Sequence, residues 1–90
     1  MWKIEKAIEK IRTVECPTGE LKNRIADILD DFNVANRNDI QINRNEAFDR
    51  DGAEAYVAGL RDDMNRSLVV LSKPGLDDYV ARVVDAYQMK

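Results

Sequence analysis

The longest periodic stretch of the sequence runs from Asp51 to Leu71, and it constrains the possible fold more than any other feature. Its apolar residues recur at steps of four and three along the chain: Ala53, Val57, Leu60, Met64, Leu68 and Leu71. This spacing places side chains on one face of an α-helix. The sequence therefore predicts a central helix over residues 51–71, around which the rest of the chain packs.

Three further segments carry the same kind of apolar stripe, and they lie at residues 2–14, 18–34 and 76–88. Each stripe needs a partner that covers it, and four such stripes can share one core. Ninety residues suffice for one domain but leave little for a second. We therefore expect residues 1–90 to form a single, mainly α domain, a compact bundle of three to four helices.

Two short segments support an alternative α+β fold. Ile40 and Ile42 alternate with polar residues within 39–44, which is typical of a short strand. Residues 67–72 contain four consecutive apolar residues, and two of them are the β-branched Val69 and Val70. In this alternative the two segments are parallel strands joined by a shortened helix. The unbroken four-and-three pattern of residues 51–71 favours the helical prediction.

Several absences limit the chemistry of the chain. It contains no histidine, which removes the commonest general base and the commonest zinc ligand. The single cysteine, Cys16, cannot form an internal disulfide, so a reducing compartment is expected. The first residues do not resemble a signal peptide, and no apolar run approaches the length of a membrane span. These features predict a cytoplasmic protein with no membrane partner.

The acidic residues give no convincing metal or catalytic site. The run from Asp49 to Gly52 resembles part of a calcium-binding loop, but Ala47 and Ala58 then occupy positions that need oxygen ligands. The adjacent acids at 30–31, 62–63 and 77–78 fit solvated helix faces or first turns better than paired catalytic carboxylates. We therefore expect no catalytic residue, no metal and no cofactor, and a protein that is not an enzyme.

The segment 36–50 is the most distinctive surface candidate. Its arginines alternate with asparagines, and both side chains make forked contacts with phosphates, bases or other proteins. Three acids in the same segment balance the three arginines, and the net charge of the whole chain is -3, which opposes bulk binding of nucleic acid. The segment is either a binding loop or only a polar connection. As a binding loop it predicts these partner-binding residues: Arg37, Asn38, Arg44, Asn45 and Arg50.

These observations predict a function only at the level of a class. The first expectation is a small intracellular adaptor, inhibitor or regulator that is not an enzyme and acts by contact with another protein. The alternative is a nucleic-acid-associated regulator, a homodimer that joins two copies of the Arg/Asn-rich segment 36–50 into one basic surface. The identity of the protein partner is not predicted.

Overall fold

The computed structural model describes residues 3–61, 67–75 and 79–89, which form two helices and a five-stranded sheet. The helices are α1 (Lys3–Ile11) and α2 (Leu21–Asp31). The strands are β1 (Glu15–Pro17), β2 (Ile40–Arg44), β3 (Glu54–Leu60), β4 (Leu68–Pro74) and β5 (Val80–Gln88). Three 3-10 turns complete the order: η1 (Thr18–Glu20), η2 (Arg37–Asp39) and η3 (Glu46–Phe48).

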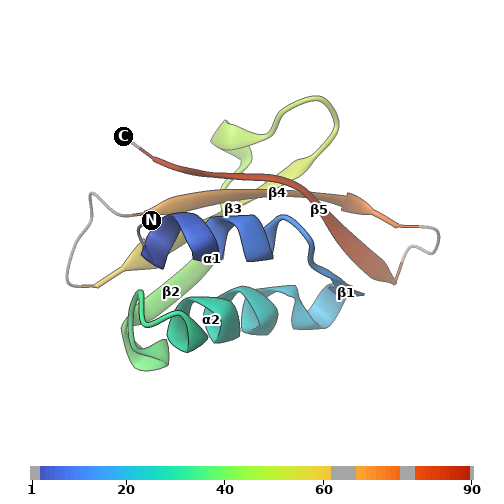
Figure 1. Ribbon diagram of the computed structural model, residues 1–90. Coiled ribbons are helices and arrows are strands. Elements are labelled where there is room, and N and C mark those ends of the chain that lie inside the picture. The colour runs from blue at the N-terminus through green and yellow to red at the C-terminus, as the bar shows by residue number, and fades with distance from the viewer. Residues whose placement is uncertain (1–2, 62–66, 76–78, 90) are drawn as a thin grey trace.

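All neighbouring strands are antiparallel, and their order across the sheet is β1-β5-β4-β3-β2. Both helices lie on one face of this twisted sheet, which we call the helix face (Figure 1). The segment between β2 and β3 rises on the opposite face, which we call the outer face. No helix in the described part of the chain is long and apolar enough to cross a membrane.

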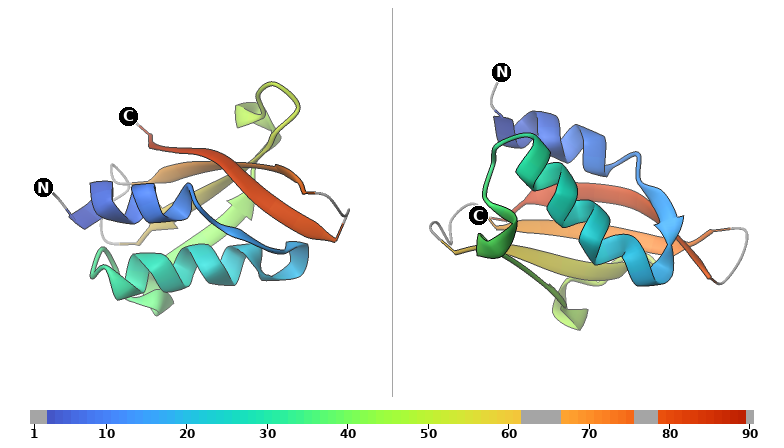
Figure 2. Two further views of the ribbon diagram at one scale, coloured as in Figure 1. Left: turned by 45° about the vertical axis from the view of Figure 1, so that its right-hand side comes forward. Right: turned by 90° about the horizontal axis from the view of Figure 1, so that it is seen from below.

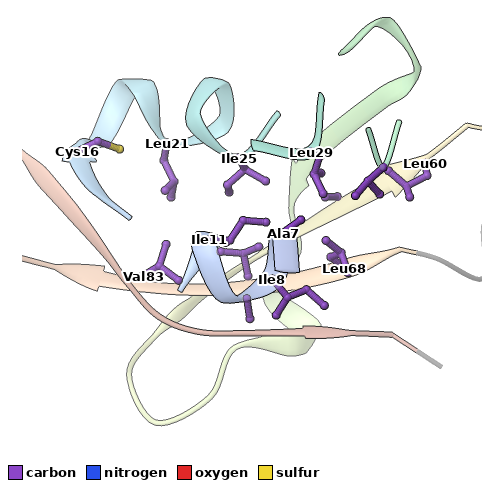
Figure 3. Packing of buried hydrophobic residues seen from close by; sticks show 14 of the residues in the cluster. Ala7, Ile8, Ile11, Cys16, Leu21, Ile25, Leu29, Leu60, Leu68 and Val83 are labelled. Carbon is purple, nitrogen blue, oxygen red and sulfur yellow. The ribbon is translucent and has the colours of Figure 1, made fainter. Parts of the chain in front are cut away.

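The main core lies between the two helices and the helix face of the sheet. Leu21, Ile25 and Leu29 of α2 point toward Ala7 and Ile11 of α1 (Figure 3). All five side chains are buried, and each large one stabilises the fold by about 1.5–3 kcal/mol. The apolar stripes of the expected helices 2–14 and 18–34 are therefore core stripes, although both helices are shorter than expected. Residues 15–17 form β1 between them.

The prediction of a helical bundle is wrong, and the expected central helix 51–71 is the clearest failure. Residues 54–60 form β3, and β4 begins at Leu68; Met64 lies outside the described residues. In β4, Val69 faces the outer face and Val70 the helix face, yet both are 0% exposed. A strand that is covered on both faces shows no alternation of apolar and polar residues. The four-and-three steps are therefore a coincidence, because they combine apolar residues of two separate strands, β3 and β4.

The expected helix 76–88 is also wrong, because residues 80–88 form β5. The register between β4 and β5 shifts at Leu71/Ser72, where Val84 is the extra residue of a bulge. The bulge changes the spacing of inward side chains from two to three, which imitates a helical step. Strands do occur within the 39–44 and 67–72 segments of the alternative fold, but β3 separates them and every pairing is antiparallel.

Candidate functional site

The outer face of the sheet carries a second, smaller apolar cluster. Its fully buried members are Ala53, Ala55, Val69 and Leu71, and Phe48 packs against them. Phe48 belongs to residues 45–53, the segment between β2 and β3, which we call the η3 loop. The loop therefore covers one half of the outer face, and its Phe48 provides the apolar contact.

Two arginines hold the η3 loop in place. Arg44, at the end of β2, donates two hydrogen bonds to the Asp49 carboxylate, at 2.7 and 2.9 Å. The Asp49 carboxylate also accepts a hydrogen bond from the Ala55 N–H at 2.8 Å. These hydrogen bonds stabilise the ionised carboxylate and hold the pKa of Asp49 below its ordinary value. The bonds from Arg44 have the larger effect, and the bond from Ala55 adds to it.

The second arginine reaches across the outer face to β5. Arg50 of the η3 loop donates a hydrogen bond to Asp85 at 2.8 Å, and its guanidinium lies 5.8 Å from the centre of the Tyr87 ring. Two adjacent residues of the loop are therefore fixed to the sheet, Asp49 to Arg44 of β2 and Arg50 to Asp85 of β5. Both side chains of this second ion pair are partly exposed, so the contact is screened by solvent.

The other half of the outer face is an open groove of about 920 Å³. Val57 and Gly59 of β3 lie on its floor, and their register partners on β2 are Asn43 and Gln41. Met89 borders the groove and joins the outer cluster. The remaining lining residues are Asn38, Asp39, Ile40, Arg44, Asn45, Leu60, Arg61 and Ser67. The surface is thus an apolar floor bordered by amides and by charges of both signs.

Gly59 deepens this groove, and the backbone does not require a glycine there. Its φ lies outside the left-handed region, and a Cβ added to it would meet only the Gln41 carbonyl oxygen, at an ordinary 3.7 Å. A side chain at position 59 would also favour the strand, because glycine weakens strand interiors. The glycine therefore costs some stability and leaves room on the outer face.

The structure brings together only part of the predicted site. Asn38, Arg44 and Asn45 line the groove, whereas Arg37 and Arg50 do not. Arg37 forms an ion pair with Asp27 and donates a hydrogen bond to Asn23, so it ties η2 to α2. Asn45 also caps η3, because its side chain accepts a hydrogen bond from the backbone N–H at position 47, at 3.0 Å. The segment 36–50 is therefore partly a structural connection.

Sequence reasoning missed the floor of the groove. The predicted helix 51–71 includes Val57, Gly59 and Arg61, and no sequence pattern singles out Met89. The available signal was Gly59, a glycine inside an apolar run, which often marks a close approach or a space in a strand. The register that places Gly59 beside Gln41 could not be read from the sequence.

The described residues contain no group of three or more acids or cysteines that could hold a metal ion. The residues of the calcium-loop resemblance instead form a tight turn, in which Asp51 and Gly52 both have positive φ. Cys16 is only 4% exposed, and burial raises the pKa of its thiol, so it is a poor nucleophile. Cys16 is not part of the groove lining. Comparisons of the chain with protein-family models, with curated proteins and with solved structures give no match.

Proposed function

We propose that this chain is a small adaptor, inhibitor or regulator that is not an enzyme, and that its protein partner occupies the outer-face groove. The observation that carries the proposal is the groove itself, whose floor is left open by Gly59 at a position where a side chain would fit. An apolar floor with a polar margin is the usual composition of a protein-binding surface. The single cysteine cannot form an internal disulfide, which fits a reducing, cytoplasmic setting for this partner.

The environment of the arginines supports a protein partner over a nucleic acid. Arg37, Arg44 and Arg50 each form an ion pair with an aspartate of the same chain, respectively Asp27, Asp49 and Asp85. A nucleic-acid surface needs positive charge that is not already neutralised. Replacing the three arginines by alanine would also remove the contacts that hold η2 and the η3 loop, so that variant would not separate binding from folding.

The test is a variant that fills the groove. Gly59→Val adds a branched side chain to the floor at a position where glycine weakens the strand, so the fold is expected to remain intact. Wild-type and variant chains, each immobilised on resin, are incubated with lysate of the source cell, and bound proteins are quantified by mass spectrometry. A partner of the groove should bind the wild type and be depleted at least about tenfold on Gly59→Val, because a filled pocket excludes the partner's side chain.

The matched control is Gly19→Val, which makes the same substitution at a glycine with open space around it and no positive φ. This position precedes α2 and is not part of the groove lining. Partners should bind the control as they bind the wild type. If Gly59→Val captures the same proteins as the wild type in the same amounts, the groove is not the binding surface.

A further inference from the structure

The two edges of the sheet differ in how their backbone groups are satisfied. The edge strand β1 is only three residues long and includes Pro17, which has no N–H to offer. Beyond it, the exposed edge of β5 is capped by side chains. Arg12 donates two hydrogen bonds to the Ala86 carbonyl, at 3.1 and 2.9 Å, and the Asp85 carboxylate accepts one from the Ala86 N–H. This edge is protected against a further strand.

The other edge strand of the sheet is β2 (Figure 2). Among residues 3–61, 67–75 and 79–89, no side chain forms a hydrogen bond with the outward backbone groups of its central residues. The backbone N–H of Asn45 donates to the Ala55 carbonyl, and the Arg61 N–H donates to the Asp39 carbonyl. Because hydrogen-bonded positions alternate along an antiparallel pair, the odd-numbered residues of β2 direct their backbone groups toward β3. The backbone groups of Ile40, Ile42 and Arg44 therefore point away from the sheet. The Ile40 N–H donates a hydrogen bond to the Arg37 carbonyl of η2. The other five outward groups are the Ile40 carbonyl and the N–H and carbonyl groups of Ile42 and Arg44, and they have no backbone partner among the described residues.

We infer that β2 pairs with β2 of a second copy of this chain, antiparallel about a two-fold axis at Ile42. In this register Ile42 faces Ile42 of the second copy and exchanges two backbone hydrogen bonds with it. The Arg44 N–H of each copy donates to the Ile40 carbonyl of the other, which gives four bonds in all. Each Ile40–Arg44 pair makes only one of its two possible bonds, because the Ile40 N–H already donates to the Arg37 carbonyl. Gln41 faces Asn43 of the second copy on the outer face, and two amides can bond each other.

The alternative registers are less favourable for two separate reasons. Shifting the axis toward Ile40 leaves only two backbone bonds, because the Ile40 N–H is already used. Shifting it toward Asn43 keeps four bonds but makes the two Arg44 side chains diagonal neighbours, roughly 7–8 Å apart. Each Arg44 is paired with its own Asp49, so the repulsion between them is small but unfavourable. With the axis at Ile42, the two arginines lie at opposite ends of the strand pair, roughly 13 Å apart. Hydrogen bonding and charge thus favour the same register.

This inference goes beyond the proposed function and does not depend on it. Gln41 and Asn43 form the β2 side of the groove, so pairing of the two β2 strands would place the two grooves side by side. The dimer would then present two binding surfaces on one continuous ten-stranded sheet. The five-residue strand pair is short, so the association is expected to be weak and dependent on concentration.

The first test removes a single outward donor. Ile42→Pro deletes the Ile42 N–H without removing a bond to β3, and proline is tolerated in edge strands at such positions. Ile42→Ala is the matched control, because it also loses the isoleucine side chain but keeps the N–H. Masses are measured by light scattering from about 1 µM to about 500 µM, a range that covers weak association. Wild type and Ile42→Ala should approach the mass of two chains with rising concentration, whereas Ile42→Pro should remain a monomer.

The second test uses the exposed residues Gln41 and Asn43, so it does not depend on how well the proline variant folds. Gln41→Lys with Asn43→Glu places opposite charges across the two-fold axis, and Gln41→Lys with Asn43→Lys places like charges there. The first double variant should dimerise more tightly than the second by roughly fivefold or more. A wild type that stays monomeric throughout, or double variants with equal dissociation constants, would overturn the inference.

Discussion

Substituting alanine for Gly59 should stabilise the protein, which is unusual for a single mutation. The backbone contribution is about 0.5–1 kcal/mol, because alanine restricts the unfolded chain more than glycine does. The added methyl group would meet only the Gln41 carbonyl oxygen at 3.7 Å, so no repulsion offsets this gain. Partial burial of the methyl adds about 0.3–0.4 kcal/mol, roughly half the value for a fully buried group. The expected gain is therefore about 1 kcal/mol.

Gly52→Ala is the matched control for this prediction. A Cβ added to Gly52 would meet nothing within 4 Å, so it too would meet no repulsion, but the φ of Gly52 is +82°, a conformation that disfavours every side chain. The two substitutions therefore differ mainly in backbone conformation, and we expect opposite signs. Gly59→Ala should raise the Tm by about 4–8 °C, and Gly52→Ala should lower it by a similar amount. Thermal unfolding followed by circular dichroism measures both. A Gly59→Ala variant that melts below the wild type would refute the geometry of the groove floor.

Three further predictions concern the η3 loop, the two faces of the sheet and the buried thiol. Because the folded pKa of Asp49 lies below its ordinary value of 3.8, its contribution to stability is present above that pH and is lost as the pH falls through the folded value. The unfolding free energy of Asp49→Asn should therefore depend less on pH below about pH 4 than that of the wild type, as measured by urea unfolding from pH 6 downward. If the two chains show the same dependence of unfolding free energy on pH, the Arg44–Asp49 contact is contradicted. Val69→Ala and Val70→Ala should each cost about 1–3 kcal/mol of unfolding free energy, since both side chains are 0% exposed on opposite faces of β4; a negligible cost for Val69 would show that the outer cluster is not a core. Cys16 in the folded chain should react with iodoacetamide at least about tenfold more slowly than in the urea-unfolded chain, because burial and a raised thiol pKa both slow the reaction; equal rates would contradict its placement.

Local patterns in the sequence located the two helices but mistook three strands, β3, β4 and β5, for helices. The stripes of α1 and α2 arise from hydrogen bonds within each segment, so the helical period appears directly in the sequence. In β3 and β4 the hydrogen-bonding partners lie in other segments of the chain. Both faces of β4 are covered, so its period of two disappears. The bulge at Val84 removed the same signal from β5.

Three of the five predicted partner-binding residues lie at the groove, and the other two lie elsewhere. Asn38, Arg44 and Asn45 do line the groove, and the sequence singled them out as unusual polar residues. Whether an arginine on this segment faces solvent or an aspartate depends on contacts such as that between Arg50 and Asp85, which lie 35 positions apart. No local pattern reports such a pairing.

By itself, the sequence determined what chemistry the chain lacks and where its two helices lie. The absence of histidine and of any internal disulfide follows from composition alone, and the helical stripes follow from local periodicity. Only the tertiary structure decided that Gln41 borders Gly59, that the β1 edge is capped, and that the β2 edge is open. The physical reason is that a strand is completed by hydrogen bonds to residues far away in the chain, and the identity of those residues is set when the sheet assembles.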